Sequence, residues 1–199
     1  MWQLPIAYLA FVGGICAAIA TTPEPGPEEV RAIIRVTAFT SAVPFLLIFT
    51  ASALHRLRRS AVSRWLMANR RYLGLSVAAS HFWHLIAIVV LIRLYSSGSE
   101  PIATTTLVFG TAGFVVLGLM AATSNDASQR ALGRAWGWLH IVGVYILWLD
   151  FIFTYMGTAT IAPFHGVMTL AFAAAWTLRV LAFYDVRSAG SRPAASPAS

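Results

Sequence analysis

The chain has 199 residues, of which 58% are hydrophobic and 11% are charged, and its mean hydropathy is +0.73. About 25% of the residues in soluble domains are charged, so this composition excludes an ordinary soluble protein and indicates one embedded in lipid. About six spanning helices of ~20 residues use the whole length. We therefore expect no FAD or NAD site in this chain, and no nucleic-acid partner despite the net charge of +7, because basic residues of membrane proteins set orientation.

Six apolar runs are each long enough to cross about 30 Å of hydrocarbon as an α-helix. They are continuously apolar, so they do not fit the alternating strands of a membrane barrel. The fold class is predicted to be an all-α integral membrane protein, a bundle of six transmembrane helices. The predicted spans are 4–21, 36–54, 72–94, 102–123, 135–156 and 161–183. Residues 1–187 are expected to form a single transmembrane domain, and the Ser-, Ala- and Pro-rich residues 188–199 a disordered cytoplasmic tail.

The distribution of arginines predicts the orientation of the bundle. Ten arginines lie on one side of it and four glutamates on the other, so the positive-inside rule assigns the arginine-rich side, with both termini, to the cytoplasm. All 14 basic residues are arginine, which is typical of a GC-rich bacterial genome, and we predict a multi-pass protein of the bacterial plasma (inner) membrane. Signal-peptide cleavage after Ala20 is the alternative, and it would leave five spans. The ten are Arg56, Arg58, Arg59, Arg64, Arg70, Arg71, Arg130, Arg134, Arg187 and Arg192.

Polar side chains inside lipid are costly, so those within the apolar runs are functional candidates. They are His81, His84, His140, Asp150 and His165, with His55 at a helix end. The sequence has no nucleotide-binding loop and no cysteine cluster for zinc or iron–sulfur, since Cys16 is the single cysteine. A kinase or hydrolase is therefore poorly supported.

Histidines on different helices of a bundle can bind haem from both faces. His84 and His140 lie in the third and fifth runs, which both cross from the cytoplasm outward. Two imidazole ligands leave no open iron position, which favours electron transfer over oxygen binding.

Two sequence blocks resemble the ferric-reductase-like transmembrane family. Residues 70–75 have the sequence RRYLGL and precede His84 by nine residues, and residues 132–140 have the sequence LGRAWGWLH and end at His140. A full helix separates the blocks, as in the family. Within that family, the two blocks most resemble the haem-binding membrane subunit of the bacterial methionine-sulfoxide reductase system.

The resemblance implies that His84 and His140 bind one cytoplasmic-side haem b. Family members with two haems have a second histidine 13–14 residues further along each helix. Here those positions are Gly98, Phe153 and Thr154, so no second haem is expected. The tyrosine usual four residues after the fifth-helix histidine is displaced to Tyr145.

Several roles stay open. Counting residues from Arg71 and Arg134 puts His84 about 10 Å deeper than His140, so His81, one turn nearer the cytoplasm, is an alternative ligand. Arg70, Arg71 and Arg134 are candidates to bind haem propionates, or they only set topology. Asp150 is either paired with Arg35 or Arg93, or accepts a proton from quinol, and His165 is interfacial or part of an outer quinone site.

The leading hypothesis is a cytochrome-b-like electron-transfer subunit, an oxidoreductase component. It would pass electrons from a quinol or a separate flavoprotein to a partner reductase or an external acceptor. The alternatives are a non-enzymatic transporter or assembly module that uses the intramembrane histidines and Asp150, and a relative that has lost haem.

Overall fold

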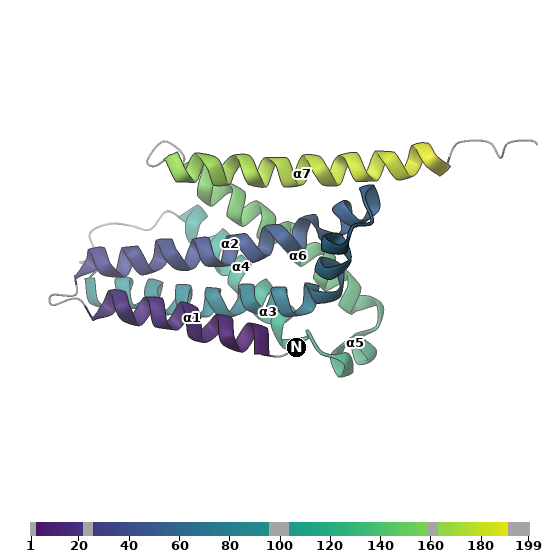
Figure 1. Ribbon diagram of the computed structural model, residues 1–199. Coiled ribbons are helices and arrows are strands. Elements are labelled where there is room, and N and C mark those ends of the chain that lie inside the picture. Colours follow the sequence, from purple (N-terminus) through teal and green to yellow (C-terminus); the bar gives the residue numbers. More distant parts are fainter. Residues whose placement is uncertain (1–2, 22–25, 96–103, 159–162, 191–199) are drawn as a thin grey trace, which may run out of the picture.

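The computed structural model describes residues 3–21, 26–95, 104–158 and 163–190, and every regular element in these ranges is helical (Figure 1). The elements are α1 Gln3–Ala20, α2 Pro27–Leu57, α3 Ala61–Val90, the π-helical turn η1 Leu91–Tyr95, α4 Thr104–Ala122, α5 Asp126–Leu132, α6 Arg134–Gly157 and α7 Pro163–Gly190. The predicted all-α class is confirmed. Helix α7 continues three residues into the predicted tail, and residues 191–199 lie outside the described part of the chain.

Five helices are long and apolar enough to cross a membrane: α1, α2, α3 with η1, α6 and α7. The fourth predicted run forms α4, which bends by 104° into the short helix α5. If α4 and α5 count as one broken span, the total is six, as predicted.

The arginine-rich segment between the second and third spans is mostly helical. Helix α2 ends at Leu57 and α3 begins at Ala61, so only three residues connect them. Ser60 caps α3 by accepting a hydrogen bond from the Ser63 amide at 3.1 Å. Arg64, Arg70 and Arg71 therefore lie on the first turns of α3 instead of in a loop, because a capped helix continues beyond the apolar run.

A proline shapes the contact between α1 and α2. Pro44 lies inside α2 and has no amide hydrogen, so it cannot donate the usual helical hydrogen bond to the carbonyl of Thr40. The hydroxyl of Tyr8 on α1 donates to that carbonyl. Helix α1 thus satisfies a backbone group that lipid cannot.

Small residues allow close packing of two helix pairs. Between α2 and α3, Ser80 donates to the Thr37 carbonyl at 2.9 Å, and both side chains are fully buried. Between α4 and α6, a Cβ on Gly143 would collide with the side chains of Met120 and Val116, the latter at 2.9 Å. Close packing of this kind stabilises helix pairs in a membrane, where the hydrophobic effect does not drive helices together.

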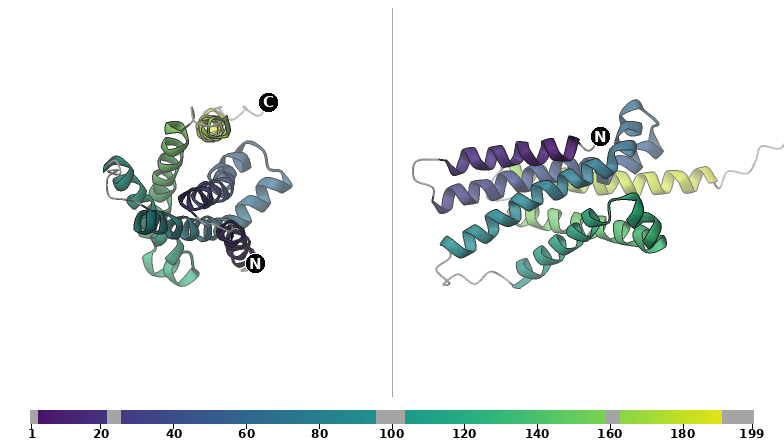
Figure 2. Two further views of the ribbon diagram at one scale, coloured as in Figure 1. Left: turned by 90° about the vertical axis from the view of Figure 1, so that its left-hand side faces the viewer. Right: turned by 90° about the horizontal axis from the view of Figure 1, so that it is seen from below.

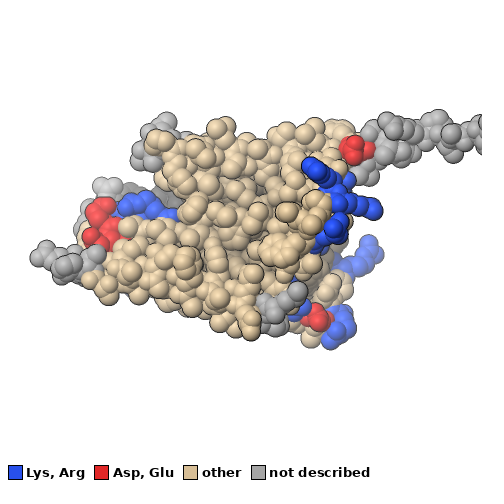
Figure 3. Space-filling model, in the orientation of Figure 1, with Lys and Arg blue, Asp and Glu red and all other residues tan. Residues whose placement is uncertain are grey.

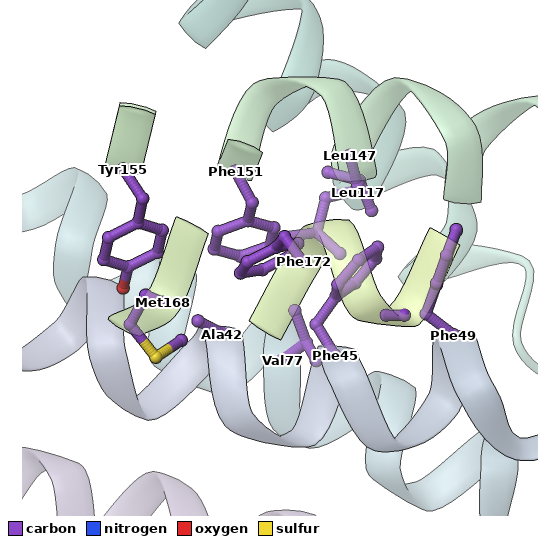
Figure 4. Close-up of a cluster of buried hydrophobic side chains, with 11 residues drawn as sticks. Ala42, Phe45, Phe49, Val77, Leu117, Leu147, Phe151, Tyr155, Met168 and Phe172 are labelled. Carbon is purple, nitrogen blue, oxygen red and sulfur yellow. The ribbon is translucent and has the colours of Figure 1, made fainter. Parts of the chain in front are cut away.

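The core is a column of aromatic and aliphatic side chains along the middle of the bundle (Figure 4). Phe45 and Phe49 of α2 stack at 5.8 Å between ring centroids, and Phe151 of α6 lies 5.4 Å from Phe172 of α7. Outward-facing side chains remain apolar, as in Leu170, which is 71% exposed. This pattern suits a surface solvated by lipid.

Charge divides the bundle into two ends. The α2–α3 connection and α5 lie at one end, here called the arginine end, and the belt between the ends is uncharged on the face that Figure 3 shows. Helix α1 begins and α7 ends at the arginine end (Figure 1; Figure 2, right). The arrangement agrees with both termini on one side, while the side itself stays a prediction.

Candidate functional site

A cavity of about 480 Å³ lies toward the arginine end, and α2 through α7 all contribute to its walls. Phe45 and Ile48 come from α2, Gly74 and Val77 from α3, and Leu117 from α4. Its size is in the range of small-molecule and cofactor sites. We call it the main cavity.

His140 lines the main cavity from α6 in a form suited to binding a metal. Its Nδ1 lies 3.0 Å from the Trp136 carbonyl, which can only accept, so Nδ1 carries the hydrogen and donates it. Its Nε2 then has a free lone pair, and that atom is buried with no hydrogen-bond partner. Metal-binding histidines commonly have this arrangement, with one nitrogen fixed by a carbonyl.

The indole of Trp136 holds the His140 ring from one side. The two rings stack with centroids 4.1 Å apart, and the Trp136 indole donates to the Thr123 carbonyl at 2.9 Å. Rotation of the imidazole would therefore break its stacking on Trp136 and its hydrogen bond to the Trp136 carbonyl.

Two glycines leave open space in the main cavity. A Cβ on Gly74 or on Gly137 would meet no heavy atom within 4 Å. Gly143, by contrast, faces the side chains of Met120 and Val116 of α4. The free volume therefore adjoins His140 and extends along α6 past Val144 to Leu147, on a side of the helix other than that of Gly143.

Three arginines line the main cavity, and they are not the three expected. Arg70 and Arg71 are among them, but Arg134 is exposed and does not line it. Arg71 is also engaged elsewhere: it donates to the Ser124 carbonyl at 2.7 Å and pairs with Asp126 at 2.7 Å. The residues that present guanidinium groups to the cavity are thus Arg70, Arg71 and, from α7, Arg179.

Arg179 was missed by sequence reasoning, because it lies inside the last apolar run. It donates to the Phe49 carbonyl at 2.8 Å and to the Tyr145 hydroxyl at 3.1 Å. Its guanidinium carbon lies 4.5 Å from the Phe49 ring centroid and 5.1 Å from that of Tyr145. A single arginine within an apolar span was the signal that could have identified it.

His84 lies outside the main cavity, on the α2–α3 contact. Its Nδ1 donates to the Ile34 carbonyl at 3.1 Å and lies 2.9 Å from the Thr37 hydroxyl. His81 is buried 5.5 Å away between ring centroids, and its Nδ1 has no partner. The two α3 histidines therefore form a pair of their own.

Contacts through α4 show that His84 and His140 lie at different levels of the bundle. The His84 ring stacks on Phe114 at 6.1 Å, and next to Phe114 a Cβ on Gly113 would lie 3.1 Å from Asp150 Oδ2. His84 is thus level with Asp150, ten residues beyond His140, which corresponds to about 15 Å along the helix.

His81 is also too far from His140 for the two side chains to bind one iron in this arrangement. Its ring contacts Phe151 at 5.5 Å, and Phe151 is eleven residues beyond His140, or about 16 Å. Metal–imidazole bonds are about 2 Å long, so neither α3 histidine reaches an iron on His140 in this arrangement. The structure does not bring the predicted pair together.

The remaining polar candidates occupy separate places. Asp150 forms no salt bridge with Arg35 or Arg93 within the described ranges, so the expected ion pair is not observed. His165 lies at the end opposite the arginine end, donating to the Thr158 carbonyl at 3.2 Å, and His55 lies 3.3 Å from the Ser63 hydroxyl. In the part of the chain that the structure describes, no three metal-binding side chains gather in one place.

Comparison with known proteins gives consistent relatives. A "Protein-methionine-sulfoxide reductase heme-binding subunit MsrQ" of Cronobacter sakazakii (strain ATCC BAA-894) is 29% identical over 147 residues, which cover 72% of this chain and 64% of that protein. The protein of the same name from Enterobacter sp. (strain 638) is 32% identical over 106 residues, covering 51% of this chain and 53% of that protein. The chain thus spans between half and two thirds of the length of these relatives. No solved structure matches it.

The family comparison covers most of the helices that line the main cavity, but not α7. Residues 36–152 match the family described as "Ferric reductase like transmembrane component". The match includes His84, His140 and both sequence blocks around them, and it extends over more than half of the 199 residues. The chain belongs to the ferric-reductase-like transmembrane family.

Proposed function

We propose that this protein is a membrane electron-transfer subunit that holds one haem b in the main cavity, with His140 as an axial ligand. The observation that carries the proposal is the buried, partnerless Nε2 of His140 beside about 480 Å³ of free volume. Family membership and the names of the two relatives support haem as the ligand. A bound haem supplies one-electron redox chemistry.

The residues around the cavity fit the parts of a haem. His140 would bind the iron, oriented by Trp136. Arg70 and Arg71 line the cavity and would form charge-assisted hydrogen bonds with the propionates. Apolar walls from α2, α3 and α4, such as Phe45, Val77 and Leu117, would exclude water from the ring.

The predicted second ligand is the part of the proposal that the geometry supports least. His84 would have to move about 15 Å toward the arginine end to reach the same iron. His140 is therefore the ligand that the geometry supports, and His84 is the second ligand that the family resemblance implies. The low-spin pairing of His84 with His140 becomes the alternative outcome of the test.

The electron donor and acceptor follow from the same reasoning. We propose a membrane quinol or a separate flavoprotein as donor. The relatives are named as subunits of a methionine-sulfoxide reductase, which supports a separate partner reductase as acceptor. A bacterial inner-membrane location, with the main cavity toward the cytoplasm, is part of this proposal.

Optical spectra of the purified full chain, oxidised and reduced, test the haem assignment. Wild type should contain about one haem per chain, and His140→Ala should lose most of it. His84→Ala and His165→Ala are matched controls that should keep the wild-type spectrum. A colourless protein after haem supplementation would refute the proposal. A low-spin spectrum that disappears in both His84→Ala and His140→Ala would instead establish the pairing predicted from sequence.

One observation supports a second candidate. His81, His84 and Asp150 lie at one level of the bundle, next to the buried hydroxyls of Thr37 and Ser80. In a transporter or assembly module these groups would form a proton or ligand path. That candidate gains support if the protein binds no haem and His81→Ala abolishes its cellular function while His140→Ala does not.

A further inference from the structure

A smaller cavity of about 270 Å³ adjoins the main cavity between α2 and α7. Ser52, Tyr145 and Arg179 line both cavities, so their side chains form the wall between the two. We call it the side cavity. The haem proposal does not use it.

The walls of the side cavity combine flat aromatic rings with two guanidinium groups. Trp176 and Tyr184 of α7 contribute the rings, and Arg56 of α2 adds a second arginine to Arg179. Trp176 is 41% exposed and Tyr184 is 62% exposed, so both can contact a ligand that approaches from the outside. Such a lining recognises a flat ring that carries hydrogen-bond-accepting oxygens.

The charge of Arg179 needs a partner. No carboxylate pairs with Arg179 among the residues that the structure describes. Its two hydrogen bonds, to the Phe49 carbonyl and the Tyr145 hydroxyl, use two of its five donors. A cation in a spanning helix is costly, and the Phe49 ring offsets only part of that cost. An oxygen atom of a bound ligand could accept hydrogen bonds from the remaining donors of Arg179.

The ligand must also reach the cavity from the membrane. Helix α7 is a candidate span, and next to the cavity Leu181 is 56% exposed and apolar. A compound with an apolar tail can enter along such a surface, while its polar ring stays near the arginine end.

We propose that the side cavity binds the ring of a membrane quinone, with Arg56 and Arg179 donating to its oxygens and Trp176 contacting its face. The inference rests on the proposed electron-transfer function and gives the quinol donor a place. The bound ring would be separated from the main cavity by the side chains of Tyr145 and Arg179.

Binding of decylubiquinone to the purified, haem-loaded full chain tests this. The affinity is read from quenching of tryptophan fluorescence. Arg179→Gln and Arg56→Gln should each weaken binding about tenfold or more, since a charge-assisted hydrogen bond contributes about 1.5–3 kcal/mol and 1.4 kcal/mol is tenfold. Arg59→Gln is the matched control, because Arg59 is equally exposed and lines neither cavity, and it should bind as wild type does.

Arg56 protects the test against misfolding, because its side chain is exposed and it lines the side cavity but not the main cavity. Arg56→Gln should leave the haem spectrum unchanged and lower the affinity for decylubiquinone. Equal affinities in all three variants would overturn the inference, as would displacement of decylubiquinone by inorganic phosphate, which would indicate a lipid-phosphate site. Haem binding without quinone binding defeats this inference alone, and quinone binding without haem defeats the proposed function alone.

Discussion

Gly74 and Gly143 show how the same residue type serves opposite purposes in this bundle. Gly74 lines the main cavity and has open space where a Cβ would be, while Gly143 is pressed against Met120 and Val116. One glycine therefore leaves room for a ligand, and the other leaves room for a neighbouring helix.

Substituting each glycine by phenylalanine should separate the two roles. Gly74→Phe should fill the main cavity and remove most of the haem, with the thermal midpoint within about 2 °C of wild type. Gly143→Phe should lower the midpoint by at least about 4 °C, because overpacking costs about 1–3 kcal/mol. Thermal unfolding and haem content are measured on the same samples. Full haem in Gly74→Phe would place the haem elsewhere.

Single residues also show what sequence reasoning could and could not find. His140 was predicted as a haem ligand because a polar group in an apolar run is conspicuous. It lines the main cavity, and its role as a ligand stays a prediction. Arg179 is also a polar residue in an apolar run, but its position within the predicted span 161–183 gave no sign that it lines a cavity. Arg71 was expected to be free for a ligand, and it is also tied to Ser124 and Asp126. Sequence position predicts that a side chain is near a site, but its contacts decide what it can still bind.

At the scale of elements, each predicted apolar run falls on one helix, but α2 and α3 begin nine and eleven residues before their runs, and the relative heights of the helices were not predicted. The apolar runs lie within the observed helices to within about two residues at most ends. Counting from Arg71 and Arg134 gave an offset of about 10 Å between His84 and His140, whereas contacts through Phe114 give about 15 Å. The height of one helix relative to its neighbour depends on how their side chains pack, and this cannot be obtained by counting residues.

The docking of α1 on α2 offers a test at this scale. Tyr8→Phe should destabilise the protein by about 1 kcal/mol, because the Thr40 carbonyl loses its donor. In a Pro44→Ala background the new amide of residue 44 can bond that carbonyl within α2, so the same Tyr8 change should cost less than about half as much. A double-mutant cycle of unfolding free energies measures the difference. Equal costs in both backgrounds would mean that Tyr8 acts through packing alone.

For the whole molecule, the uncharged belt and the two charged ends predict how the bundle lies in the bilayer. Glu28 lies in the first turn of α2 and Arg59 in the α2–α3 connection, at opposite ends of the bundle (Figure 1), and both are exposed. Cys16, the single cysteine, is buried at 7% exposure, so it gives little background to labelling. In intact cells a membrane-impermeant maleimide should label Glu28→Cys and not Arg59→Cys, because the arginine end is predicted to be cytoplasmic. After the cells are opened, both variants should be labelled. Labelling of Arg59→Cys in intact cells would invert the bundle, place the main cavity on the outer side, and exclude a cytoplasmic flavoprotein as its direct electron donor.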